Sequence, residues 1–83
     1  MKKEEMICTC EIGVSVSEIH RDSGEKGILE LINEFELMGI KVISRVDGMF
    51  NGDEDWELEG TREALERTLT TLGWDIFTIE FED

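Results

Sequence analysis

The sequence is poor in positive charge. It has 8 lysines and arginines against 21 aspartates and glutamates, which gives a formal net charge of −13 at pH 7. Contacts with phosphate groups depend on lysine and arginine, so this shortage disfavours direct binding to DNA, RNA or an anionic membrane. It favours a partner protein with a basic surface, with which an acidic protein associates in a fast, salt-dependent way. Solubility or adaptation to high salt remains the alternative explanation of the charge.

Long hydrophobic runs are also absent. No stretch approaches the roughly 18 apolar residues that a membrane-spanning helix needs. The charged start "MKKEEM" is not followed by the apolar segment of a signal peptide. We therefore expect a cytoplasmic protein. With 83 residues, of which 40% are hydrophobic, the chain is expected to form a single domain over residues 1–83.

Cysteine and histidine are scarce. Cys8 and Cys10 are the two cysteines, and His20 is the single histidine. On a strand, side chains two residues apart lie about 6.7 Å from each other. A disulfide needs Cβ atoms about 3.8 Å apart, and a zinc site needs about four ligands. The cysteines are therefore expected to be small buried thiols.

The acidic segment "NGDEDWE" is rich in the oxygen ligands that calcium prefers. A calcium-binding loop of the EF-hand type that began at Asn51 would need glycine at its sixth position and glutamate at its twelfth. The sequence has Trp56 and Arg62 there. No metal or other cofactor is predicted.

The first half of the chain predicts a strand, a loop and a helix. Residues 6–16 alternate between apolar and polar side chains, with the even positions facing a core. Residues 17–27 are polar and contain glycine, which indicates a loop. Residues 24–38 have the apolar spacing of an amphipathic helix, with Ser23 as its N-cap and Gly39 directly after its end.

A strand, a turn and another strand follow. The turn is "DGMFNGD", which holds two glycine signals. The third strand is "EDWELEG", in which Trp56 and Leu58 face the core. The second strand, residues 40–46, is expected to turn one set of side chains inward and the other outward: Ile40, Val42 and Val46 against Lys41, Ile43 and Arg45.

A second helix and a last strand complete the pattern. Thr61 is a suitable N-cap, Glu63 lies in the first turn, where the helix dipole favours a carboxylate, and Gly73 is placed to end the helix. The last strand is expected within residues 74–83. Its alternation predicts Phe77, Ile79 and Phe81 in the core and Thr78, Glu80 and Glu82 outside.

The resulting order, β-α-β-β-α-β, predicts an α+β fold of the ferredoxin-like type. Right-handed crossovers would place both helices on one face of a four-stranded antiparallel sheet, with the strands in the order fourth, first, third, second. The other face would be open and acidic, with a basic strip of Lys41 and Arg45 at one edge. RNA-binding versions of this fold carry aromatic residues on the central strands instead.

Carboxylates on this open face are the candidate binding residues. Along the third strand they repeat every ~6.7 Å, which is of the order of the phosphate spacing in a nucleic-acid strand. The segment around the hairpin would extend the row. The predicted partner-binding residues are Asp53, Glu54, Asp55, Glu57, Glu59, Glu11, Glu80 and Glu82.

The predicted function is to bind the basic surface of a partner protein, without catalysis, as a nucleic-acid mimic. The chain is similar in kind to phage-encoded inhibitors of host defence such as anti-CRISPR proteins, which are small, acidic and free of catalytic motifs. A ligand-binding or oligomerising regulatory module is the first alternative. In that case Ile7 and Ile43 on the open face would support a homodimer.

An enzyme is the second alternative. The segment "HRDSGEKG", residues 20–27, precedes a predicted helix, whose N-terminal N–H groups would attract an anion. In element order, and in the place of this loop, the chain resembles acylphosphatases, which implies a small phosphatase. The second strand has no asparagine where those enzymes have a catalytic one. Asp22 and Glu25 would also repel an anionic substrate.

Overall fold

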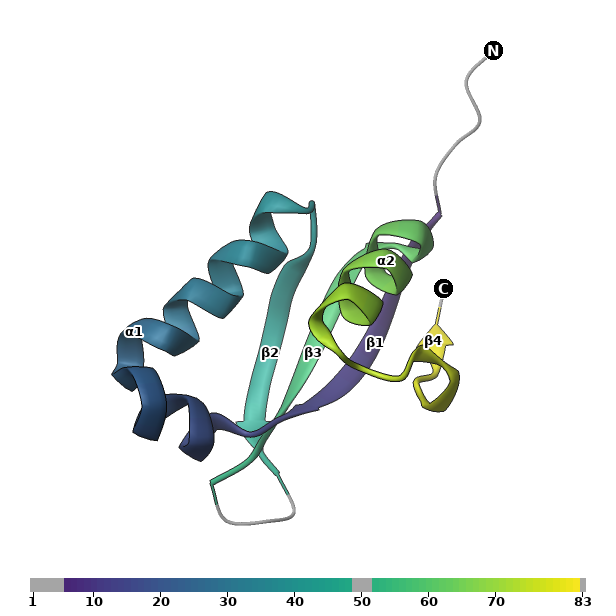
Figure 1. The fold of residues 1–83 in the computed structure, drawn as a ribbon. Helices are drawn as coiled ribbons and strands as arrows, with labels where there is room; N and C mark the ends of the chain where they lie inside the picture. Colours follow the sequence, from purple (N-terminus) through teal and green to yellow (C-terminus); the bar gives the residue numbers. More distant parts are fainter. Residues whose placement is uncertain (1–5, 49–51, 83) are drawn as a thin grey trace.

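The computed structural model describes residues 6–48 and 52–82 (Figure 1). The start of the predicted domain, the centre of the predicted hairpin turn and the final residue of the predicted last strand lie outside these ranges. The elements are β1 (Ile7–Val14), α1 (Val16–Leu37), β2 (Lys41–Asp47), β3 (Glu54–Thr61), α2 (Arg62–Leu72), the 3-10 turn η1 (Ile76–Thr78) and β4 (Phe81–Glu82).

The four strands form one antiparallel sheet in the order β2-β3-β1-β4. This confirms the predicted α+β, ferredoxin-like fold and its strand order. α1 contacts β2 and α2 contacts β3 (Figure 1). In the parts of the chain that the structure describes, neither helix combines the length and the apolar character that a membrane crossing requires.

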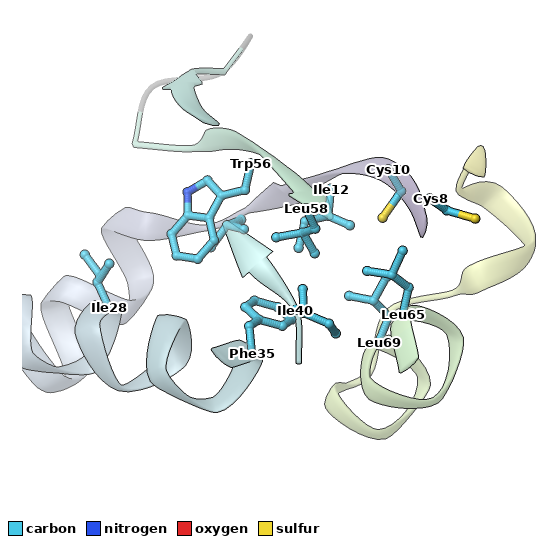
Figure 2. Packing of buried hydrophobic residues seen from close by; sticks show 11 residues of the cluster. Cys8, Cys10, Ile12, Ile28, Phe35, Ile40, Trp56, Leu58, Leu65 and Leu69 are labelled. Atoms are coloured by element: carbon cyan, nitrogen blue, oxygen red, sulfur yellow. The ribbon is translucent and has the colours of Figure 1, made fainter. Parts of the chain in front are cut away.

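The core lies between the sheet and the two helices (Figure 2). Within β1 and β3 the predicted alternation is confirmed, because Cys8, Cys10, Ile12, Val14, Trp56 and Leu58 are buried. At the ends of the predicted first strand it fails, since Met6 is 62% exposed and Val16 begins α1. Phe35 of α1 meets Trp56 edge to face, with ring centroids 6.5 Å apart. The fully or nearly fully buried cluster consists of Cys8, Cys10, Ile12, Val14, Ile28, Phe35, Ile40, Trp56, Leu58, Leu65 and Leu69.

Both cysteines are buried thiols, as expected. Burial raises the pKa of the Cys10 thiol to about 11, and the neighbouring Cys8 adds to this shift. The thiolate is the reactive form of cysteine, so a thiol with such a pKa stays protonated and inert at neutral pH.

The ends of the helices follow the sequence signals, with one exception. Thr61 caps α2, since its hydroxyl oxygen accepts a hydrogen bond of 3.1 Å from the N–H of Ala64. Gly39 and Gly73 follow the two helices with φ of 81° and 106°, which only glycine adopts readily. Ser23 is the exception, because it lies inside α1 and does not cap it.

α1 begins at Val16, so the predicted loop over residues 17–27 is wrong. These residues are helical apart from a kink at Gly24, where φ is 72°. The polar residues and glycines in this segment are typical of a loop, but tertiary packing overrides local preference. Ile19 packs against the core from the first turns of the helix. Gly24 then redirects the chain, and the remainder of α1 carries Phe35 into the core.

β2 contains an irregularity between Val42 and Ser44 that changes which side chains face the core. An extra residue in one strand of a pair reverses the faces of the residues that follow it. Beyond this point Arg45 pairs with the buried Trp56, and Val46 turns to the open face with 52% of its surface exposed. The prediction that placed Val46 in the core and Arg45 on the open face is therefore wrong.

The end of the chain departs furthest from the prediction. Within the predicted strand of residues 74–83, only Phe81–Glu82 pair with β1, and Ile76–Thr78 form η1 instead. Asp75 supplies the reason, because its carboxylate accepts a hydrogen bond of 3.0 Å from the N–H of Phe77. Short polar side chains that bond nearby backbone in this way compete with a strand ladder.

Phe77 is 93% exposed, so its predicted core position is wrong. Ile79 and Phe81 pack against the core as predicted, although both are only partly buried. Trp74 and Ile76, whose even numbers put them on the outer side of the predicted strand, also pack there.

Candidate functional site: the open face of the sheet

Two central strands, β1 and β3, carry carboxylates on the sheet face that the helices leave uncovered. Glu11 lies directly opposite Glu57 in the strand register. The Cα atoms of opposite residues in an antiparallel pair are about 4.5–5.5 Å apart. Like charges placed in this way destabilise a sheet. The centre of the open face therefore holds an unfavourable pair of negative charges.

A second row of residues crosses all four strands next to this pair. Glu82 of β4 lies opposite Thr9, Thr9 lies opposite Glu59 of β3, and Glu59 lies opposite Lys41 of β2. Lys41 stands at the end of the row, on the edge strand. The predicted basic strip is thus reduced to Lys41, because the irregularity in β2 moves Arg45 to the helix side.

The ion pairs of the described residues lie away from the open face. They join Arg21 to Asp22, Arg45 to Glu54, Arg62 to Glu66 and Arg67 to Glu63. The last two of these pairs lie along α2, and in each of them the two residues are four positions apart in the sequence. Within residues 6–48 and 52–82, none of the open-face acids takes part in an ion pair: Glu11, Asp55, Glu57, Glu59, Glu80 and Glu82.

A hollow of about 470 Å³ brings four of these acids together. Glu11 and Glu57 come from the central strands, while Glu80 and Glu82 come from the end of the chain. Thr78, the last residue of η1, and Ile79, which follows it, continue the wall that this last segment forms. The hollow therefore unites carboxylates that are far apart in the sequence.

Glu54 does not belong to this face. Glu54 lies two residues before Trp56 and therefore on the same side of β3, the side that faces the helices. One of its carboxylate oxygens accepts hydrogen bonds of 2.9 Å from both Arg45 Nε and Trp56 Nε1. The Arg45 guanidinium, through its hydrogen bond, holds the pKa of the Glu54 carboxyl below its usual value. The Trp56 N–H adds to this effect and partial burial opposes it. Arg45 also lies over the Trp56 ring, 5.0 Å from its centroid. Glu54 thus serves the fold and does not extend the acidic row.

Asp53 lies at the entrance to β3, beside a second hollow of about 350 Å³. His20 and Arg21, the basic residues of the predicted anion-binding segment, line the same hollow from α1. Asp47, Asp53 and Glu54 also line it, and their negative charge opposes binding of an anionic substrate. The segment that resembles the acylphosphatase loop is helical here and faces carboxylates.

Histidine, cysteine, aspartate and glutamate are the side chains that could hold a metal ion. In the described ranges, no three side chains of histidine, cysteine, aspartate or glutamate are grouped so that they would hold a metal ion. The carboxylates of the open face are spread along strands instead of converging on one point. Such a spread matches a row of separate cations better than one ion.

Comparisons with models of protein families, with curated proteins and with solved structures found no match. The evidence for a function is therefore the arrangement of charge on the open face. Alternation in the sequence was sufficient to find Glu11, Asp55, Glu57 and Glu59. The same alternation places Glu54 on the side of Trp56 and Leu58, and the prediction joined Glu54 to the acidic row only as part of the hairpin.

Proposed function

We propose that the protein binds a basic surface of a partner protein through the open face of its sheet, without catalysis, in the cytoplasm. One observation carries the proposal: in the described residues the open-face acids have no ion-pair partner, whereas every ion pair lies elsewhere. Lysines and arginines of a partner would supply the missing cations.

The opposed carboxylates of Glu11 and Glu57 give a physical reason why a cation would bind here. Opposed carboxylates raise the free energy of the isolated sheet. A guanidinium or ammonium group placed between them would donate charge-assisted hydrogen bonds to both carboxylates, and such bonds are stronger than those between neutral groups. A basic partner thus relieves a repulsion that water and salt only screen.

The spacing of the charges favours one class of basic surface. Asp55, Glu57 and Glu59 repeat every ~6.7 Å along β3, on the scale of successive phosphates. A groove that binds nucleic acid has cations arranged to meet such a row. The protein would occupy that groove as a nucleic-acid mimic and so act as an inhibitor, the role of phage-encoded anti-CRISPR proteins.

A homodimer is the second candidate, and a specific observation favours it. Val46 joins Ile7 and Ile43 as an exposed apolar residue of the sheet, with exposed fractions of 52%, 53% and 41%. Sedimentation would decide between the two readings. A tight dimer that is insensitive to salt favours an oligomerising module, and a monomer favours the basic partner.

The test of the proposal uses an octalysine peptide as a basic probe. A triple variant, Asp55→Lys, Glu57→Lys and Glu59→Lys, is compared with a matched variant on α1, Glu25→Lys, Glu30→Lys and Glu36→Lys. Each set changes three charges by two, so the formal net charge goes from −13 to −7 in both. The peptide is titrated into the ¹⁵N-labelled proteins at low ionic strength.

We expect the peptide to shift the amide signals of β1 and β3 in the wild type, and the open-face variant to lose binding. The α1 variant should keep it. Equal loss in both variants would mean that only net charge matters, and the proposal would be wrong. A neutral set, Asp55→Asn, Glu57→Gln and Glu59→Gln, guards against misfolding, since it removes the charges without introducing new repulsion.

A further inference from the structure

The 3-10 turn η1 holds one aromatic side chain in water. Phe77 is 93% exposed, although its neighbours in the chain are anchored. Ile76 and Ile79 pack against the core. The N–H of Ile79 donates to the carbonyl oxygen of Ile76 over 3.2 Å, which closes the turn. The ring is therefore presented by a built turn and is not the end of a frayed segment.

Asp75 and Trp74, the two residues that precede η1, hold the start of the turn. The Asp75 carboxylate accepts from the Phe77 N–H, and its carbonyl oxygen accepts from the Thr78 hydroxyl over 2.8 Å. The indole N–H of Trp74 donates to the carbonyl oxygen of Gly13 in β1 over 3.1 Å. These bonds tie the start of the turn to the sheet, so the backbone at Phe77 has little conformational freedom to lose on binding.

The turn stands at the rim of the acidic hollow. Thr78, Ile79 and Glu80, which directly follow Phe77, form part of the wall of that hollow. Consecutive Cα atoms are about 3.8 Å apart, so the ring begins within one residue of the wall. Binding hot spots are enriched in aromatic side chains that a partner covers and removes from water.

We propose that Phe77 is an aromatic anchor of the interface, and that the basic partner presents an aromatic ring among its lysines and arginines. This inference rests on the proposed function. Basic grooves with aromatic stacking surfaces are the means by which proteins bind single-stranded nucleic acids. In a complex with such a groove, Phe77 would take the place of a base while the neighbouring carboxylates take the places of phosphates.

The test uses two peptides, Lys₃-Trp-Lys₃ and Lys₃-Ala-Lys₃, titrated calorimetrically at low ionic strength. Aromatic pairing contributes about 0.5–1.5 kcal/mol, so wild type should prefer the tryptophan peptide by roughly 2- to 10-fold. Phe77→Ala should abolish this preference and leave the affinity for the alanine peptide unchanged. Leu37→Ala is the control, because Leu37 is 77% exposed on α1, away from the hollow.

Two further outcomes separate the anchor from the acidic face. If the preference survives in Phe77→Ala, or disappears equally in Leu37→Ala, the anchor is wrong, and the proposed function still stands on the binding of both peptides. If neither peptide binds at the open face, both proposals are wrong. Because the Phe77 side chain is in water, unfolding of Phe77→Ala is not expected, and its thermal midpoint checks this directly.

Discussion

Neutralising Glu57 should make the folded domain more stable while it weakens binding. The side chain lies opposite Glu11 and has no ion-pair partner among the described residues. Glu57→Gln keeps the shape and removes one charge of the repelling pair. Most substitutions in a sheet destabilise it, so a gain in stability would be a specific sign of this repulsion.

The magnitude follows from the geometry of the pair. Two unit charges about 6 Å apart repel by about 0.7 kcal/mol in water and by about 3 kcal/mol at an effective dielectric constant of about 20. Glu11 is exposed and Glu57 is partly exposed, so the lower value applies. Direct like-charge pairs across strands fall in the same range, about 0.2–1 kcal/mol. We expect a gain of about 0.5–1 kcal/mol in the free energy of unfolding.

Thermal unfolding at pH 7 measures this gain. For a domain of this size, 1 kcal/mol corresponds to about 4–8 °C, so Glu57→Gln should raise the midpoint by about 2–8 °C. The difference should shrink at high salt, because the screening length falls from about 30 Å at 0.01 M to about 3 Å at 1 M. Glu30→Gln on α1 controls for the general effect of lowering the net charge.

A double-mutant cycle completes the measurement. If the gain comes from the pair, Glu11→Gln and Glu57→Gln should each stabilise, and the double variant should gain less than the sum of the two. Additive gains would mean that each residue responds to net charge alone. A Glu57→Gln variant no more stable than Glu30→Gln would refute the argument that the open face holds unrelieved repulsion.

Two other predictions concern the residues that hold the fold. Glu54 has a lowered pKa in the folded state, so its contribution to stability is present above the ordinary glutamate pKa and is lost as the pH falls through the lowered value. Glu54→Gln should therefore flatten the acid side of a plot of unfolding free energy against pH. An unchanged slope would contradict the role of the bond from Arg45. Trp56 is fully buried, whereas Phe77 is in water. In urea unfolding, Trp56→Phe should therefore lower the free energy of unfolding, and Trp56→Ala should lower it further, by about 3–5 kcal/mol, while Phe77→Ala should stay within about 0.5 kcal/mol of wild type. Equal effects of Trp56→Ala and Phe77→Ala would show that the two side chains are not placed as described.

The sequence predicted those parts of the fold whose local signals agree with tertiary packing. Trp56 and Leu58 alternate with acids on β3, and only one choice of face buries them. Thr61 and Gly73 mark the ends of α2, where cap and left-handed glycine are required by the backbone itself. In such segments local and global preferences coincide, which is the condition under which sequence patterns are most informative.

The errors fall where a long-range contact overrides a local pattern. Residues 17–23 look like a loop, yet Ile19 is drawn into the core and the segment is helical. The segment from Trp74 alternates well enough for a strand, but the Trp74 indole is fixed on the carbonyl of Gly13 and the Asp75 carboxylate closes a turn. The partner of Trp74 lies far away in the chain and cannot be found from spacing, whereas the bond of Asp75 is local and competes with the strand directly.

The irregularity in β2 has the largest consequence for function, because it changes the charge of the open face. A regular strand would have put Arg45 beside Lys41 on that face, where it would have offset the acids of β3. The extra residue sends Arg45 to the helix side, where Glu54 and the Trp56 ring bind it. One base is thereby removed from the open face and one acid is used to hold it. The acids that remain on the open face therefore have fewer positive charges near them than the alternation of the sequence implies. A basic partner would supply those positive charges.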